Sequence, residues 1–201
     1  MSSTERAGAF HSGVMHLNEI LVGREAAAAS APELLLACHA RIRHFVQLGQ
    51  TLATVRVVSI EEVVESSRAL FRYFHDALPL HEADENESLY PRLLPLPRWN
   101  LVREAGEAML EQHRAVNELV AELLPICEIL KREPERLAVL CGHLQQVTHA
   151  LGQVFAAHLN LEESVIFPAL PELLTPEQMD AMLREMQARR RPPATRIHLV
   201  Q

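Results

Sequence analysis

Hydrophobic residues recur along this chain every three or four positions, which is the period of an α-helix with one buried face. In two segments the core-facing positions repeat at strict seven-residue intervals, through Val102, Met109, Val116 and Leu123 and through Leu137, Leu144, Leu151, His158 and Val165. Extended runs rich in Val, Ile and Thr are nearly absent, and no Asn-Gly hairpin signal occurs. The pattern therefore predicts an all-α chain.

Residues that favour the first turn of a helix divide the chain into four long helices and a short fifth one. The predicted starts are Pro32, Ser59 with its capping-box partner Glu62, Asn100, Pro134, and Thr175 with Pro176 and Gln178. Modest links between long helices favour an up-down antiparallel four-helix bundle with a short extra C-terminal helix. We expect residues 1–30 to be a weakly patterned lead-in, residues 31–190 to be the bundle, and residues 191–201 to be a tail.

Prolines are expected to bend or end these helices, because proline lacks the amide that a helix interior needs. Pro79 is predicted to kink the second helix without ending it, since His81 lies on the same apolar stripe as Phe74. The second, third and fourth helices are expected to end at Pro91, Pro125 and Pro168.

The formal charge of −7 argues against a general nucleic-acid binder, which needs a basic surface. Arg189, Arg190 and Arg191 form one basic cluster. The simplest interpretation of this cluster is a solvated helix end, where the helix dipole favours positive charge.

The three cysteines, Cys38, Cys127 and Cys141, are odd in number and do not have metal-knuckle spacing, which favours a reducing compartment. No signal-peptide pattern is present, and the longest apolar runs are far shorter than the roughly 18 residues of a membrane span. We expect a cytoplasmic protein with no membrane partner. The sequence leaves the oligomeric state open.

Two segments of the chain share a motif. Residues 81–91 read HEADENESLYP, and residues 158–168 read HLNLEESVIFP. Each has a histidine, a glutamate four residues later, and then an aliphatic residue, an aromatic residue and a proline at equal offsets. Matched positions are 77 residues apart throughout.

The four-residue spacing has a chemical meaning, because it puts the histidine and the glutamate on one helix face, roughly 5–6 Å apart at Cβ. Two such helices offer two imidazoles and two carboxylates, and each carboxylate can bridge two ions that lie about 3.5–4 Å apart. Glu85 and Glu162 fall on core-facing positions, where an unpaired carboxylate costs several kcal/mol. A bound cation removes that cost.

Two more histidines flank the apolar stripes of the other long helices. His39 precedes His81 by 42 residues, and His113 precedes His158 by 45. Each half of the chain therefore supplies one histidine and then one His-x-x-x-Glu, a near-repeat that predicts a pseudo-symmetric two-metal site. Four nitrogens and two carboxylates suit iron, manganese or zinc.

These segments resemble the hemerythrin-like, or HHE cation-binding, family. The phrases LACHARI, LHEADENESLYP, EQHRAV and HLNLEESVIFP carry the resemblance, which extends over roughly residues 30–190. It implies an up-down bundle around a di-iron centre with an oxo or hydroxo bridge. By this resemblance Glu85 and Glu162 bridge the ions, and the terminal ligands are His39, His81, His113 and His158.

The chain differs from oxygen-carrying hemerythrins at two places. Asn117 stands where the carriers have a second histidine on the third helix, and Glu162 follows His158 by four residues where the carriers have an aspartate at five. Both differences argue against reversible oxygen carriage. They leave a coordination position for water, a substrate or a small gas.

Three functions are compatible with this pattern. The favoured one is a non-haem di-iron protein that binds or senses oxygen, nitric oxide or redox state, or that handles iron. The second is a di-iron oxidoreductase of peroxidase or catalase-like type, with peroxide as its small partner. The third is a helical interaction protein with vestigial histidines. No catalytic residue is assigned, and the remaining histidines, including His44, His75, His143 and His149, are expected to be solvated or capping.

Overall fold

The structure, a computed structural model, describes residues 28–191. Within this range all regular structure is helical, and no strand occurs. Most of the expected lead-in (1–27) and tail (192–201) lies outside the described residues. None of the described helices is both long and apolar enough to cross a membrane.

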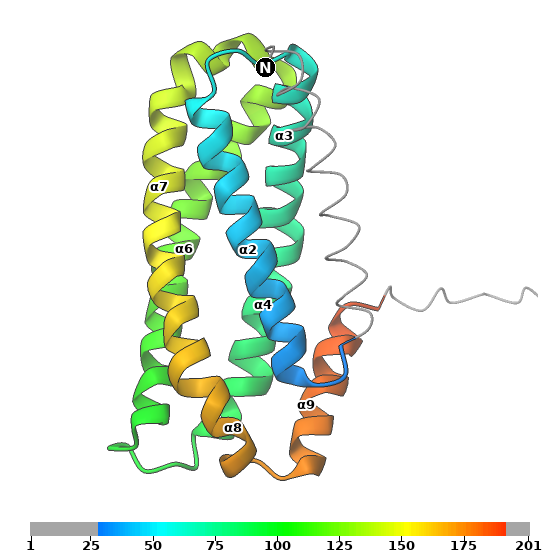
Figure 1. Cartoon of the computed structure of the whole chain (residues 1–201), viewed down its shortest axis with the longest axis vertical. Helices are drawn as coiled ribbons and strands as arrows, with labels where there is room; N and C mark the ends of the chain where they lie inside the picture. The colour runs from blue at the N-terminus through cyan, green and yellow to red at the C-terminus, as the bar shows by residue number, and fades with distance from the viewer. Residues whose placement is uncertain (1–27, 192–201) are drawn as a thin grey trace, which may run out of the picture.

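Four long helical columns pack side by side along the long axis of the molecule (Figure 1). The first column is α2 (Ala31–Thr54), and the third is α6 (Leu101–Arg132). The second column runs without a break through α3 (Ile60–Arg72), a π turn (Tyr73–Ala77), α4 (Leu78–Ala83), a second π turn (Asp84–Leu89) and α5 (Tyr90–Leu93). The fourth column runs through a 3-10 turn (Pro134–Arg136), α7 (Leu137–Leu161), a third π turn (Glu162–Ile166) and α8 (Phe167–Leu173).

A shorter helix, α9 (Pro176–Arg189), follows the fourth column and packs beside α2 and the second π turn. Its N-terminus has the predicted capping box between Thr175 and Gln178. The capping box of Ser59 with Glu62 and the N-cap at Asn100 also form as expected. Local capping chemistry therefore places the starts of these helices where the sequence predicted them.

Three prolines do not end their helices as expected. The helices continue past Pro91, Pro125 and Pro168 to Leu93, Arg132 and Leu173. A π turn precedes both Pro91 and Pro168 and includes the residue four positions earlier, whose carbonyl would meet the proline ring in an α-helix. Pro125 has no such turn, and buried neighbours on α6 hold the helix against the core.

The buried apolar side chains form two clusters. The larger core includes Phe45, Leu70, Leu123 and Leu151, and the smaller core includes Leu34, Leu93, Met109, Leu170 and Met182. From the N-terminus to the C-terminus, α2 and α6 contribute first to the smaller core and then to the larger core. The second and fourth columns contribute first to the larger core and then to the smaller core. A buried polar layer crosses all four columns between the two cores.

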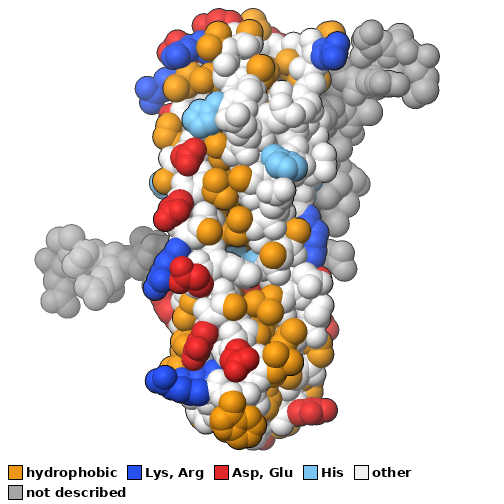
Figure 2. All heavy atoms as spheres, turned by 90° about the vertical axis from the view of Figure 1, so that its left-hand side faces the viewer, with side chains coloured by type: hydrophobic (Ala, Val, Ile, Leu, Met, Phe, Trp, Pro, Cys, Tyr) orange, Lys and Arg blue, Asp and Glu red, His pale blue; other side chains and the backbone are white. Residues whose placement is uncertain are grey.

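The surface of the described residues carries both signs of charge. Figure 2 shows acidic and basic side chains interspersed with apolar atoms over the face formed by α7 and its neighbours. This face lacks the continuous basic field that binds nucleic acid non-specifically.

Candidate metal centre

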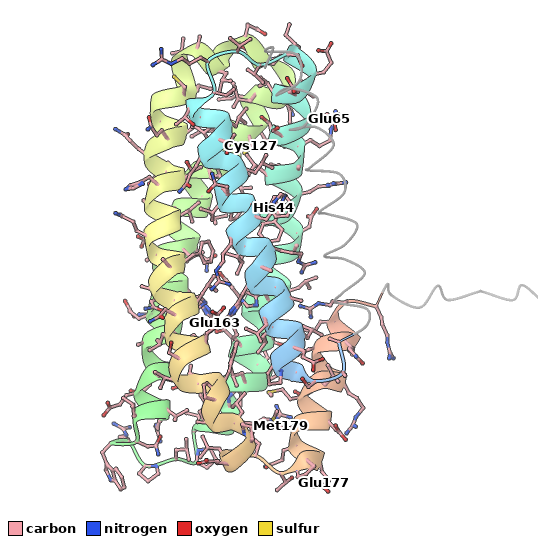
Figure 3. The ribbon with its side chains drawn as sticks, in the orientation of Figure 1. His44, Glu65, Cys127, Glu163, Glu177 and Met179 are labelled. Atoms are coloured by element: carbon pink, nitrogen blue, oxygen red, sulfur yellow. The ribbon has the colours of Figure 1, made fainter. Side chains whose placement is uncertain are left out.

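The six predicted ligand side chains lie together in the polar layer between the two cores. They come from all four columns, and each residue is at most 5 % exposed. The contributing elements are α2 with His39, α4 with His81, the second π turn with Glu85, α6 with His113, α7 with His158 and the third π turn with Glu162. Figure 3 shows the neighbouring Glu163 at this level, between α2 and α7.

Their donor atoms form two groups, each close enough to surround one cation. The first group is His39, His81, Glu85 and Glu162, and the second is Glu85, His113 and His158. The two histidines of each group come from the same half of the sequence. Glu85 belongs to both groups, which is the arrangement that a bridging carboxylate requires.

Each glutamate reaches the single histidine of the opposite half. Glu85 Oε2 lies 2.9 Å from His113 Nε2, and Glu162 Oε2 lies 2.8 Å from His39 Nε2. The other oxygen of each carboxylate faces the histidine of its own motif, with Glu85 Oε1 3.0 Å from His81 Nε2 and Glu162 Oε1 3.5 Å from His158 Nε2. The two motifs are thus interleaved in space.

Outer hydrogen bonds orient three of the imidazoles. The acceptors are Glu163 Oε1 for His39 Nδ1 at 2.8 Å, Asn86 Oδ1 for His113 Nδ1 at 3.0 Å, and Gln112 Oε1 for His158 Nδ1 at 3.1 Å. Because each partner atom is an acceptor, the Nδ1 carries the proton and the Nε2 lone pair points into the centre.

These lone pairs give a test of whether a cation fits. His39 Nε2 faces Glu162 Oε2, two electron-pair donors at 2.8 Å, and neither atom has a hydrogen bond. Two such donors repel each other unless a cation or a proton lies between them. Two donors that each lie about 2.1 Å from one ion, with a donor–ion–donor angle of about 90°, are about 3 Å apart. The shorter distances between imidazole Nε2 and carboxylate oxygens in the centre, 2.8 to 3.0 Å, agree with this value. The residues present therefore fit a metal ion.

The π turns set the position of both glutamates. The amide of Tyr90 donates to the carbonyl of Glu85, and the amide of Phe167 donates to the carbonyl of Glu162, each across five residues instead of four. These bonds occupy equivalent positions in the two motifs. The ring of Phe167 also stacks on His39, with centroids 5.3 Å apart.

Burial and the neighbouring charged groups shift the pKa values of the two carboxyls in opposite directions. Burial, followed by the nearby Glu85 carboxylate, raises the pKa of Glu162 well above its usual range. Burial also opposes the charge on Glu85, but the neighbouring histidines, His81 foremost, hold its pKa well below the usual range. Burial lowers the pKa of His39 to about 4 and that of His158 to about 3, which keeps both imidazoles neutral, the form that binds metal.

The other histidines of the described range belong to neither group of donors. His44 packs edge-on against Phe45. His75 and His143 are exposed beside acidic side chains, and His149 lies on the surface between α2 and α7. His11, His16 and His198 lie outside the described residues.

Asn117 is exposed and does not join the donor groups. Its amide Nδ2 donates to Glu82 Oε2 at 3.1 Å. Sequence reasoning missed this contact and the outer partners Asn86, Gln112 and Glu163. A signal for two of them existed, since Asn86 and Glu163 follow the two motif glutamates at the same 77-residue offset.

Comparison with protein families matches residues 30–170 to the hemerythrin HHE cation binding domain. This match covers most of the chain, which therefore belongs to the hemerythrin HHE cation-binding domain family. The family and the buried histidine–glutamate cluster together identify a metal-binding domain. No curated protein and no solved structure matches the chain.

Proposed function

We propose that the chain is an up-down antiparallel hemerythrin-like bundle that binds two iron ions and uses them to bind or sense a small ligand. The two buried donor groups that share Glu85 carry this proposal. His39, His81 and Glu162 would hold the first ion, His113 and His158 would hold the second, and Glu85, which belongs to both donor groups, would bind both ions. Nitrogen and carboxylate donors suit iron, and also manganese or zinc.

Bound iron would supply redox chemistry and an open coordination position for oxygen, nitric oxide or peroxide. The second donor group has one residue fewer than the first, and Asn117 bonds to Glu82 rather than contributing a further ligand. These two observations support an open position on the side of His113 and His158. None of the three cysteines forms a disulfide with another described residue, which supports a location in the reducing cytoplasm.

Metal analysis and an optical spectrum of protein expressed with ample iron test this proposal. We expect about two iron ions per chain and a bridged di-ferric absorption band. His81→Ala and Glu162→Ala should lower the iron content, and removal of iron by a chelator should lower the melting temperature. His143→Ala, at an exposed position, is the control. Iron below about one ion per chain, or unchanged iron in the two ligand variants, would contradict the proposal.

A di-iron peroxidase or catalase-like enzyme is the second candidate, favoured by the same open position. Addition of peroxide to the reduced protein separates the two functions. A stoichiometric spectral change without turnover supports binding or sensing. Sustained peroxide consumption supports the enzyme.

A further inference from the structure

The helix α9 lies beyond the residues that match the family. It is nevertheless built into the molecule, because Met182 and Met186 are fully buried in the smaller core. Figure 1 shows α9 beside the lower ends of α2 and α4. Its C-terminal end therefore lies close to the second π turn, which carries Glu85.

Two arginines at this end, Arg189 and Arg190, each form an ion pair with one oxygen of the same buried carboxylate. Arg189 Nη1 lies 3.0 Å from Asp84 Oδ1, and Arg190 Nη2 lies 2.7 Å from Asp84 Oδ2. The carboxylate of Asp84 is 0 % exposed, and the two arginine side chains are 18 % and 16 % exposed. The interpretation of this basic cluster as a solvated helix end is therefore wrong for these two residues, and Arg191 alone is exposed.

The same two guanidinium groups contact further residues beside the metal ligands. Arg189 donates to Ser88 Oγ at 2.9 Å and to Glu87 Oε2 at 3.1 Å, so it binds three residues of the π turn. Arg190 donates to Cys38 Sγ at 3.5 Å. Asp84 directly precedes Glu85, and Cys38 directly precedes His39.

Among residues 28–191, the second motif has no corresponding ion pair. Leu161 occupies the position equivalent to Asp84, and it packs against the smaller core. A buried aspartate costs several kcal/mol unless it is paired, whereas a leucine at this position needs no partner. Within the part of the chain that the structure describes, the buried ion pair is thus a feature of one half of the centre.

We propose that Arg189 and Arg190 are positioning residues for the metal centre, which hold the Glu85-bearing π turn and the His39 segment at the geometry that retains the first metal ion. The inference rests on the proposed metal binding, and it makes α9 a part of the structure that positions the metal ligands. It predicts that docking of α9 and retention of metal are coupled.

Release of iron tests this coupling. Wild-type protein loaded with Fe²⁺ is mixed with excess ferrous chelator, and the release rate is compared with that of the double variant Arg189→Gln/Arg190→Gln. Outer-sphere substitutions typically weaken metal binding by roughly 10-fold to 100-fold, and we expect release to be faster by about that factor. Arg184→Gln, an exposed arginine on the same helix, is the matched control and should release iron at the wild-type rate.

Melting temperatures separate positioning from mere stabilisation of the fold. If the two arginines only stabilise the fold, the double variant should have a lower melting temperature than wild type by the same amount with and without iron. If they position the metal ligands, iron should raise the melting temperature of the double variant less than it raises that of wild type. Arg190→Lys keeps the positive charge beside Asp84, so iron should raise the melting temperature of this variant nearly as much as that of wild type. Asp84→Leu copies the second motif and needs no buried ion pair, so it should fold, release iron faster than wild type and be less sensitive to the arginine substitutions.

The inference would be overturned if the double variant and Asp84→Leu both released iron at the wild-type rate and were both stabilised by iron as much as wild type. That result would leave the proposed metal site intact. A wild-type chain that takes up no iron would instead overturn the proposed function. The two failures are therefore distinguishable.

Discussion

At the scale of single residues, the two donor groups differ in the side chains that accept hydrogen bonds from their histidines. Glu163 and Asn86 are equivalent in the two motifs, and each accepts a hydrogen bond from the histidine of the opposite half. One acceptor is a carboxylate, also bonded to Arg43, and the other is a neutral amide. A carboxylate partner makes an imidazole a stronger electron donor to a bound metal, so we expect the carboxylate of Glu163 to strengthen the bond between His39 and a metal ion.

Glu163→Gln should weaken metal binding at the first position. The amide oxygen can still accept from His39 Nδ1, so the change removes charge while it preserves the hydrogen bond. We expect a loss of affinity of roughly 10-fold, measured by competition with a chelator. Glu172→Gln, an exposed carboxylate on α8, is the control. Equal affinities in the two variants would show that the charge of Glu163 does not act on the metal.

His44 provides a pH-dependent contribution to stability that is separate from the centre. Burial lowers the pKa of His44 below 6.5, so the unfolded chain takes up this proton before the folded chain does. Its contribution is complete above pH 6.5 and is lost as the pH falls towards the folded pKa. In metal-free protein, His44→Gln should show a smaller drop in melting temperature between pH 8 and about pH 5.5 than wild type. The exposed His143→Gln should match the wild-type drop.

At the scale of helices, the π turns are the feature that links backbone to chemistry. Pro125 lies within a regular α-helix, so a proline alone does not produce a π turn here. The two turns that begin at or beside a motif glutamate occur at matched positions of the two motifs. The π turn therefore determines where Glu85 and Glu162 lie, and it also allows the helix to accommodate the proline that follows.

Pro168→Ala should separate these two roles. Alanine favours the α-helix by about 3 kcal/mol over proline, and return to α-helical bonding would shift Phe167 relative to Glu162 by about 100° around the helix. We expect weaker metal binding with no loss of stability in the metal-free protein. Pro171→Ala in the same helix α8, further from the ligands, should keep wild-type affinity. Wild-type affinity in both variants would contradict this role for the turn.

The ends of the helices show what sequence could and could not predict at this scale. Caps at Ser59, Asn100 and Thr175 are local hydrogen bonds between residues two or three apart, and the sequence predicted them correctly. The continuation of helices past Pro91 and Pro168 depends on packing against distant columns and on an uncommon turn. Neither leaves a periodic signal in the sequence.

At the scale of the whole molecule, the repeated motif predicted part of the arrangement of the buried polar side chains. The 77-residue offset and the seven-residue stripes predicted that His81, Glu85, His158 and Glu162 face one layer of the core. They did not predict that each carboxylate reaches the histidine of the other half, because that depends on how the columns are arranged around the axis. The contact of α9 with the π turn was missed for the same reason, since Asp84 and Arg189 are 105 residues apart.

The interleaving of the two halves has a consequence for unfolding. His39 and Glu163 are 124 residues apart in the sequence, and a metal ion bound by His39 and Glu162 would close a loop of nearly that size. Such a clip acts like a reversible cross-link between the first and last columns. No column could then detach singly while both ions stay bound, so loss of metal and opening of the bundle would become one event.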